Sequence, residues 1–531
     1  MTKPFSSHPD HPVSSDISVA ELAVLGAENS TLREENTALK RRVEWFERQL
    51  FGQKSEKRPV DNPHQPSLLG EPPATTAPEG EQISVSYQRG KAAKQRPDDC
   101  ITDSGLRFNA EVPVKVITLT APELAGTDAD QFEIIGTKST FRLAQRPASY
   151  VVLRYDRPVI KRKNTEKPLP SPAPDNVLDR SLADVSLLVG LMIDKFLYHL
   201  PLYRQHQRIT QAGITLSRAT LTHLVKRAID LLRPIVSAQL ENILLSRVLA
   251  MDETPIKAGK AGKGKLKQAW FWPLYGDEDE VVFTYSASRS RQHIEKTIKT
   301  DFTGTLISDG YAAYASYAKQ NENITHAQCW VHSRRTFIEA ESHEPDAVRE
   351  ALDAIAELYR IEEQIRAQNL SGVPKHQYRL EHSKPVVDRF FEWCDTQIRR
   401  GDLTPSNPLS KALSYVMKRE AALRVFLEDP NVPLDTNHLE RTLRPIPMGR
   451  KAWLFCWTEL GAEHVGIIQS LISTCKLHDI NPYTYLTDVL LRISEHPASR
   501  VEELTPRVWK EKFADQPLRS DLYRDINYAS E

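Results

Sequence analysis

The feature that most constrains this chain is a series of apolar runs that begins at Val248. The first run, Val248–Met251, stops at Asp252, and two longer runs follow at residues 268–276 and 281–288. Their lengths and their content of β-branched and aromatic residues predict three strands. A buried strand that ends on a carboxylate needs an explanation, because an unpaired charge is costly to take out of water.

A helix and a fourth strand continue the series. Helical spacing covers residues 290–300, and the strand after it ends at Asp309. Three strands, a helix and a strand are the order expected of a ribonuclease-H-like core. We therefore predict an α/β fold in which this core occupies residues 246–341 and 431–465, with an all-helical insert at 342–430 between its two parts.

Three carboxylates follow from this arrangement. Asp252 ends the first strand, Asp309 ends the fourth, and Glu440 lies on a helix begun by the residues 435–437. If the two strands are neighbours, their ends bring both aspartates together, where like charges repel unless a cation lies between them. Hard oxygen ligands in an open site favour two Mg²⁺ or Mn²⁺ ions over zinc. Two such ions are suited to displacement at a phosphodiester.

Each acid also has an ordinary interpretation. Asp252 could cap a turn before Pro255, and Asp309 could be a turn aspartate. Glu440 could form a surface ion pair with Arg444, four residues later in the helix. For the three acids together, the strand order and the neighbouring basic segments favour the metal-binding interpretation.

The N-terminal part predicts self-association. Residues 20–51 carry an apolar seven-residue repeat over four heptads, and flanking charges such as Glu28 and Arg33 attract each other between parallel chains. We predict a parallel coiled coil that makes the protein a homodimer or a higher oligomer; an amphipathic helix packed on its own chain is the alternative. We expect residues 1–19 to be disordered and residues 52–110 to be a proline-rich linker.

Two modules precede the predicted core. Residues 111–163 alternate as strands do and predict a small β-rich module. Residues 178–245 have helical spacing, with a turn at Gly213 and a second helix capped by Ser217. This pair resembles a helix-turn-helix, which reads DNA with its second helix. Any helical hairpin with a glycine turn would look alike, so DNA binding by this region is a hypothesis.

Basic residues cluster locally, although the 70 basic and 70 acidic residues leave the chain without net charge. Residues 257–267 carry five lysines and no acid, and the charged residues within 444–451 are likewise all basic. We expect the first segment to contact DNA; a solvated loop is the alternative. The lysines are Lys257, Lys260, Lys263, Lys265 and Lys267.

The five cysteines form no CxxC pair, which argues against a disulfide framework and against a four-cysteine zinc site. Cys329 and His332 have the spacing of half a zinc site, but no nearby pair completes it, so zinc is not expected and we assign both residues a structural role. The N-terminus has no apolar signal-peptide core, and charges interrupt the apolar segment at 182–200. We predict a cytoplasmic protein without membrane association.

A collinear series of segments makes the sequence resemble the transposases of the insertion-sequence-66 family. The segments are LFGQKSEK (50–57), PLYRQHQ, MDETP, SDGYAAY, CWVHSRRTF, TNHLERTLRP, GRKAWLF and SLISTCKLHDINPYTYL (470–486). Members of this family carry a DDE catalytic core. The resemblance assigns the three catalytic acids to Asp252 in MDETP, Asp309 in SDGYAAY and Glu440 in TNHLERTLRP.

The resemblance implies a DNA transposase that cleaves the ends of an insertion element and joins the freed 3′-hydroxyl to target DNA. The implied partners are terminal inverted repeats, target DNA and small accessory proteins of the same element. Arg441, Arg444, Arg450 and Lys451 follow the glutamate and are expected to contact backbone phosphates. A nuclease of the same fold that only hydrolyses, and a non-catalytic DNA-binding regulator, are the alternatives.

The chain departs from the family pattern in two places. Members usually have cysteine pairs in a small zinc-binding domain at the position of the β-rich module, whereas only Cys100 precedes Cys329 here, so we expect a module without zinc. The usual Asp-Asn-Asn before the third acid is Asp435-Thr436-Asn437, which should leave the helix cap intact. Residues 466–515 correspond to a C-terminal domain particular to the family.

Overall fold

The computed structural model describes most of the chain from Asp99 to Tyr523. The described residues are 99–101, 105–125, 129–146, 149–163, 168–170, 174–262, 265–299, 302–453 and 456–523. All of them belong to one compact unit, residues 94–531, which is separate from residues 1–93. The predicted disordered N-terminus, the predicted coiled coil and most of the predicted linker lie outside the described residues. Within the described ranges, no helix has the length and apolarity needed to cross a bilayer.

The first part of the unit consists of two small sheets. The strands β1 (Asp99–Ile101), β2 (Arg107–Asn109) and β7 (Ile214–Thr215) form one antiparallel sheet, so the last part of the segment predicted as a linker carries two strands. The second sheet has the order β3-β5-β4, with β6 on β5. Its strands are β3 (Val114–Thr118), β4 (Phe132–Arg146), β5 (Ser149–Arg162) and β6 (Pro168–Pro170).

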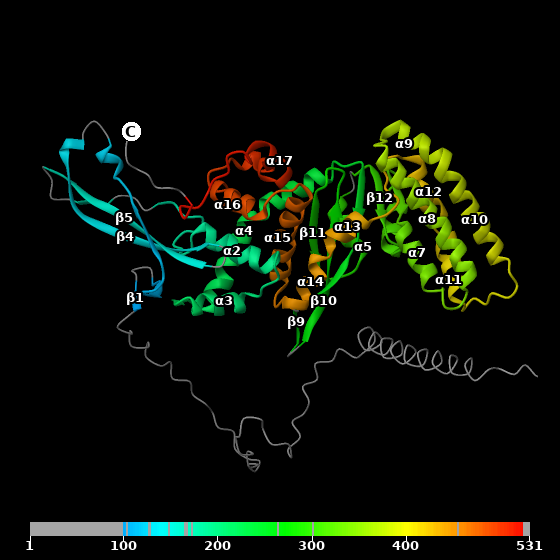
Figure 1. Ribbon diagram of the computed structural model, residues 1–531, viewed down its shortest axis with the longest axis horizontal. Coiled ribbons are helices and arrows are strands. Elements are labelled where there is room, and N and C mark those ends of the chain that lie inside the picture. The colour runs from blue at the N-terminus through cyan, green and yellow to red at the C-terminus, as the bar shows by residue number, and fades with distance from the viewer. Residues whose placement is uncertain are drawn as a thin grey trace, which may run out of the picture. The chain divides into compact units, whose positions relative to one another are not determined.

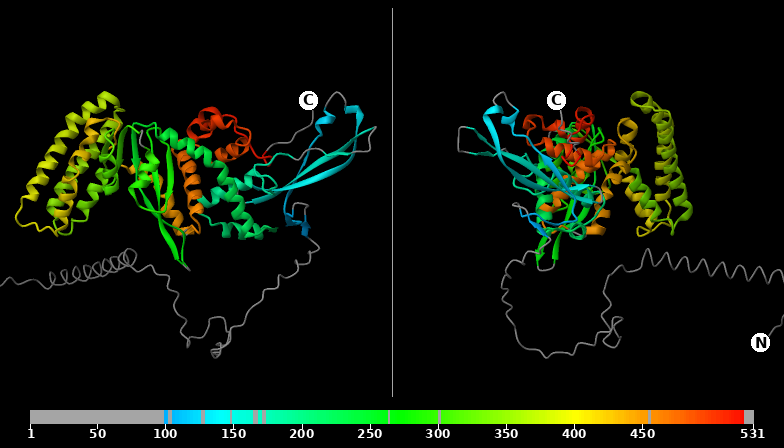
Figure 2. Two further views of the ribbon diagram at one scale, coloured as in Figure 1. Left: turned by 180° about the vertical axis from the view of Figure 1, so that it is seen from behind. Right: turned by 60° about the vertical axis from the view of Figure 1, so that its left-hand side comes forward.

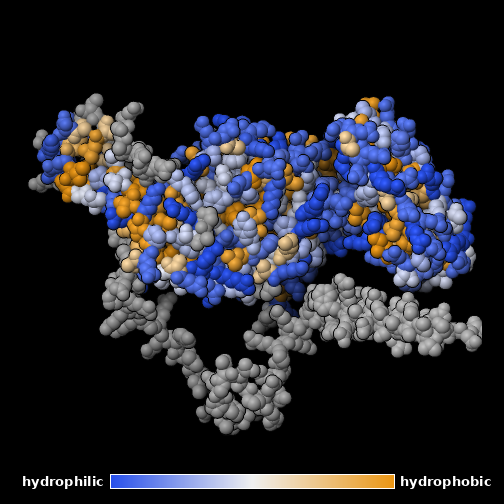
Figure 3. All heavy atoms as spheres, in the orientation of Figure 1, coloured by the Kyte–Doolittle hydropathy of each residue, from blue (hydrophilic) through white to orange (hydrophobic). Residues whose placement is uncertain are grey.

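The hairpin of β4 and β5 is long and extends away from the helices of the unit (Figure 1). Apolar residues gather on this module (Figure 3), which agrees with the exposed Val114, Val116, Ile134 and Ile135. The C-terminal segment anchors the module, because the Tyr155 hydroxyl donates a hydrogen bond of 2.9 Å to the carboxylate of Asp521.

Three helices follow: α2 (Val185–Phe196), α3 (Leu202–Gln211) and α4 (Arg218–Ile243). The turn between α3 and α4 contains Gly213 at a φ of +83°, a conformation that favours glycine. Ser217 caps α4, since its hydroxyl accepts a hydrogen bond of 3.0 Å from the backbone N–H of Thr220. The predicted helix, glycine turn and Ser217-capped helix are therefore confirmed.

The central sheet has the order β11-β10-β8-β12-β13, and β9 also pairs with β10. Strands β8, β12 and β13 are parallel to one another, whereas β10 is antiparallel to β8, β9 and β11. The strands are β8 (Val248–Met251), β9 (Thr254–Gly262), β10 (Lys265–Tyr275), β11 (Val281–Ser286), β12 (Gly304–Ser308) and β13 (Ile324–Gln328). All four residues of β8 are buried, as expected for a strand covered on both faces.

Helices cover both faces of this sheet. Phe271 and Trp272 are neighbours in β10, so their side chains point to opposite faces. The Phe271 side lies under α15 (Glu459–Leu477), where Gly466 allows a close approach. On the other side, the Trp272 ring packs edge-on against Tyr314 of α6 (Ala312–Lys319), and α5 (Arg291–Ile298) lies beside α6.

The lysine-rich segment after Asp252 is not a loop. It forms β9 and the start of β10, and this hairpin projects beyond the neighbouring helices (Figure 2). Pro255 is tolerated at the start of β9 because, among the described residues, it pairs there with β10 alone, and the isolated bridge of β9 to Cys456 lies further along the strand, at Ala258.

A helical region interrupts the chain between β13 and the helix that carries Glu440. After α7 (Trp330–Ile338) come α8 (Pro345–Ala367), α9 (Gly372–Tyr378), a π-helical turn (Arg379–Ser383), α10 (Lys384–Ile398), α11 (Pro408–Met417) and α12 (Glu420–Glu428). Trp330 of α7 packs edge-on against Phe390, Phe391 and Phe426. This aromatic cluster joins the helical region to the sheet.

The last part returns to the sheet. It consists of α13 (Asn437–Leu443), α14 (Pro445–Trp453), α15, α16 (Pro482–Arg492), a 3₁₀ segment (Ala498–Leu504) and α17 (Pro506–Lys512). The described part of the chain is thus a mixed α/β fold. Its central sheet packs against helices that come before the helical region in the sequence and against helices that come after it.

Candidate metal centre

The sheet register brings the two aspartates together. Strands β8 and β12 are parallel, and Ala250 lies opposite Ile307. The strands end one residue later, and continuing the same register places Asp252 opposite Asp309. Both side chains are partly buried. The two aspartates therefore lie together because they follow the carboxyl ends of two neighbouring parallel strands.

A third carboxylate, Glu253, belongs to this cluster. Oxygen atoms of Asp252, Glu253 and Asp309 lie within 4.8 Å of one another. The charge of Glu253 is compensated, because Arg289 donates through Nε at 2.8 Å and the Tyr314 hydroxyl donates at 2.6 Å. The Glu253 side chain is only 2% exposed. Glu253 thus links the two aspartates of the cluster to Arg289 and Tyr314.

Asp252 carries the strongest electrostatic perturbation. Its pKa is raised from 3.8 to about 7, mainly by burial and also by the negative charges of Glu253, Asp309 and Glu440. The backbone N–H of Glu253, which donates to Asp252 Oδ1 at 2.7 Å, opposes this effect. A carboxylate that is destabilised by neighbouring carboxylates is stabilised by a divalent cation, so the donor set fits Mg²⁺ or Mn²⁺.

Glu440 reaches the same region from α13. Its carboxylate lies 3.7 Å from Nε2 of His332, and its charge acts on Asp252. The side chain is 39% exposed. Glu440 is absent from the compact group formed by the other three acids, so it stands at the rim of the cluster.

Helix α7 holds α13 in place. The Cys329 sulfur accepts a hydrogen bond of 3.3 Å from the backbone N–H of Thr436, at the start of α13. Four described cysteines, Cys329 among them, carry free thiols. Thr436 occupies the N-cap position but makes no side-chain cap, which differs from the expected intact cap. Asp435 supplies the bond instead, by accepting from the N–H of Asn437 at 2.9 Å.

The helical region also contacts the Asp309 loop. The Asp309 carboxylate accepts a hydrogen bond of 2.9 Å from the backbone N–H of Tyr311. Arg419 donates to the carbonyl of Gly310 at 3.0 Å, and its guanidinium lies 3.9 Å from the centre of the Tyr415 ring. The tip of the helical region therefore supports the backbone that carries the second aspartate.

The predicted DNA-contacting residues lie in different environments. Lys257, Lys260 and Lys265 are exposed on the β9–β10 hairpin, and so are Arg444 and Lys451 after α13. Lys267 pairs with Glu459 at 3.1 Å, and Arg450 donates to the carbonyl of Pro255. Lys263 lies outside the described residues, and Arg441 points into a separate cleft described below.

Sequence reasoning missed several residues of this centre. Glu253 stands beside Asp252, and that adjacency was the only signal for it. Arg289 and Arg419 lie in no quoted motif, and Tyr314 closes SDGYAAY without any sign there of its partner Glu253, so only the folded chain reveals that these residues support the acids.

The chain matches models of known protein families. A model of the Transposase IS66 family matches residues 180–464, a model of the IS66 C-terminal element matches 470–507, and one described as Transposase C of IS166 homeodomain matches 38–99.

Three relatives come from Sinorhizobium fredii (strain NBRC 101917 / NGR234). The uncharacterized protein y4hP is 31% identical over 72% of both chains. The uncharacterized protein y4jD is 29% identical over 90% of this chain and 95% of its own, and y4qI is 28% identical over 70% and 71%. Since the first family model covers more than half of the chain and spans all the acids of the centre, the chain belongs to the Transposase IS66 family.

Proposed function

We propose that this protein is a DNA transposase with a ribonuclease-H-like core, in which Asp252, Asp309 and Glu440 form the catalytic trio. The observation that carries the proposal is the convergence of the acids that end β8 and β12, with the charge of Glu440 acting on the same site. The sheet order supports it, because the parallel strands β8, β12 and β13 adjoin the antiparallel β10 and β11.

Asp252, Asp309 and Glu440 would hold the divalent cations. Such ions, when bound, activate the attacking oxygen and stabilise the leaving oxygen at phosphorus. Hydrogen bonds orient the acids. Arg289 and Tyr314 donate to Glu253, next to the proposed ligands, and the N–H of Tyr311 donates to the Asp309 carboxylate. The exposed lysines of β9 and β10 are placed to hold the DNA backbone beside the first aspartate.

DNA recognition and self-association belong to the parts before the core. We infer that α4, whose first turns expose Arg218, His223 and Lys226, reads duplex DNA. The homeodomain-like match at residues 38–99 supports a second DNA-binding segment. The heptad repeat at residues 20–51 supports dimerisation through a parallel coiled coil, which would present two catalytic centres to the two ends of an element.

The test is a cleavage and joining assay on DNA that carries the terminal inverted repeats, with Mg²⁺ and the accessory proteins of the element. Asp252→Asn, Asp309→Asn and Glu440→Gln should each reduce joining at least about 100-fold, or about 2.7 kcal/mol in the barrier. DNA binding should persist in all three. Asp346→Asn, at a side chain that is 90% exposed on α8, is the matched control.

Two outcomes would reject the proposal. Hydrolysis without joining of a pre-cut end would indicate a nuclease, and metal-independent binding without strand breaks would indicate a regulator. Retained joining in the Asp252→Asn variant would remove the assigned trio.

A further inference from the structure

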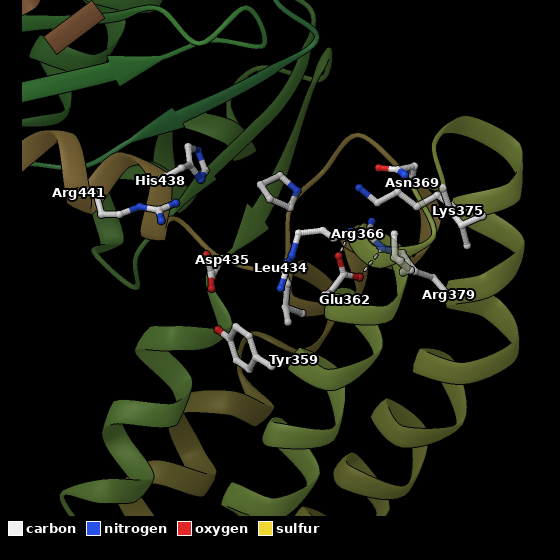
Figure 4. Close-up of a pocket in the computed structure, with 13 residues that line it drawn as sticks. Tyr359, Glu362, Arg366, Asn369, Lys375, Arg379, Leu434, Asp435, His438 and Arg441 are labelled. Atoms are coloured by element: carbon white, nitrogen blue, oxygen red, sulfur yellow. Dashed lines mark hydrogen bonds and ion pairs between the residues drawn. The ribbon is translucent and has the colours of Figure 1, made fainter. Parts of the chain in front are cut away.

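A solvent-open cleft of about 600 Å³ separates the helical region from α13 (Figure 4). Arg441 of α13 lines one wall, and Arg366 of α8 and Lys375 of α9 line the facing wall. The cleft lies on the side of α13 that carries His438 and Arg441, whereas Glu440 points toward His332. It is therefore distinct from the carboxylate cluster.

The cleft has an excess of positive charge. Glu362 is neutralised by Arg379, which donates two hydrogen bonds of 2.7 and 2.9 Å to its carboxylate. Within the described parts of the chain, the side chains of Arg366, Lys375 and Arg441 form no ion pair. Among the residues that line the cleft, one further carboxylate remains, Asp435, which accepts hydrogen bonds from Asn437; Asp429, outside the lining, also attracts Lys375. The other cations are left for a ligand.

The electrostatics at Lys375 are those of a site that a bound anion would stabilise. Burial lowers the pKa of Lys375, the positive charges of Arg379 and Arg366 lower it further, and the opposing charges of Glu362 and Asp429 do not cancel this effect. A bound anion would reverse the repulsion among these groups, because it stabilises the charged form of each.

The position and size of the cleft identify the anion. Arg441 follows Glu440 directly, so the cleft and the carboxylates lie on different sides of one helix, roughly 10 Å across. At about 3.4 Å per nucleotide, the rise of a strand stacked as in a duplex, that distance corresponds to at most about three nucleotides, and an extended strand spans it with fewer. A cavity of about 600 Å³ has the size of a small-ligand pocket and holds part of one strand, not a duplex.

We propose that this cleft binds phosphates of a single DNA strand, within about three nucleotides of the phosphate that is cleaved. The identity of the strand rests on the proposed function. The cleft would guide one separated strand across α13 while the lysine hairpin holds the DNA on the other side of the acids.

The first test is the salt dependence of binding to a short fluorescein-labelled single-stranded oligonucleotide, in EDTA. Each phosphate contact contributes about 0.7 to the slope of log K against log salt for single strands, so Arg366→Gln/Lys375→Gln should lower the slope by roughly 1.4. The control pair Arg360→Gln/Lys411→Gln removes the same charge from exposed helix positions outside the cleft and should leave the slope unchanged. If the pair misfolds, the exposed Arg366→Gln alone should lower the slope by about 0.7.

The second test locates the contact. In a strand that carries the element end, a neutral methylphosphonate is placed in turn at each of the roughly three phosphates next to the cleavage position; at one of them at least it should weaken binding by the wild type, but not by the cleft variant. An unchanged salt slope, or equal sensitivity of both proteins, overturns the proposal. Displacement of the oligonucleotide by a polyglutamate peptide as readily as by DNA also overturns it, in favour of an acidic protein ligand. Without metal no cleavage occurs, so failure here leaves the catalytic trio untested and intact.

Discussion

Replacing Asp252 by asparagine should stabilise the metal-free protein while weakening its response to Mg²⁺. Asparagine keeps an oxygen that can accept the N–H of Glu253, so the local turn survives. It removes the charge that burial and three neighbouring carboxylates destabilise. The variant therefore isolates the electrostatic cost that a cation is proposed to relieve.

The magnitude follows from the pKa. A rise from 3.8 to about 7 corresponds to an upper limit of roughly 4 kcal/mol, at about 1.36 kcal/mol per unit. Asp252 is partly exposed, so solvent reduces this to about 1–2 kcal/mol. Because the folded-state pKa is raised, the wild type loses this stability as pH rises from about 4 to about 7, and the loss is complete above that window.

Thermal unfolding in EDTA at several pH values measures this difference. Above pH 7, Asp252→Asn should melt about 2–4 °C above the wild type, and near pH 4 the two should coincide. Saturating Mg²⁺ should raise the melting temperature of the wild type more than that of the variant. Asp346→Asn serves as the exposed control. Equal melting temperatures at pH 8 in EDTA, or an equal Mg²⁺ response, would refute the reasoning.

Three further substitutions probe the supports of the site. Arg379→Met should destabilise the helical region by about 3–5 kcal/mol in urea denaturation, because it leaves Glu362 buried and unpaired, and Glu362→Leu in the same chain should restore most of that loss. Cys329→Ala should cost about 1–3 kcal/mol in thermal unfolding and reduce joining, since the N–H of Thr436 loses its acceptor; Cys329→Ser should cost less. Gly466→Ala should lower the melting temperature by pushing α15 off β11, because the new Cβ would lie 2.5 Å from a carbonyl oxygen.

The sequence predicts those features of the fold that depend on local residue patterns, such as strand ends and helix pairs. The apolar runs that end at Asp252 and Asp309 mark strand ends, and the order of elements makes those strands neighbours, as the register shows. Helical spacing and Gly213 likewise predict the α3–α4 pair. The lysine-rich β9 escaped prediction because its alternation of lysine with glycine and alanine is also typical of a solvated loop, and its pairing depends on a distant stretch of β10.

The supports of the site could not be predicted in this way. Glu253 faces the cluster because the chain bends between β8 and β9. Such a short bend cannot be predicted from the types of residue in the sequence. The cationic cleft combines Arg366, Lys375 and Arg441 from three helices whose packing is a tertiary property. The role of Cys329 was foreseen only as structural, and its hydrogen bond specifies which element it holds.

The placement of the helical region between β13 and α13 has a consequence for biosynthesis. A growing chain emerges with both aspartates first, while Glu440 follows only after α8 to α12, and α15, which covers β11, later still. A ribosome-bound fragment thus cannot assemble a complete set of acids on a covered sheet. On the proposed function, a nascent or truncated chain that ends before Glu440 lacks one of the three catalytic acids, so activity is withheld until most of the polypeptide has been made.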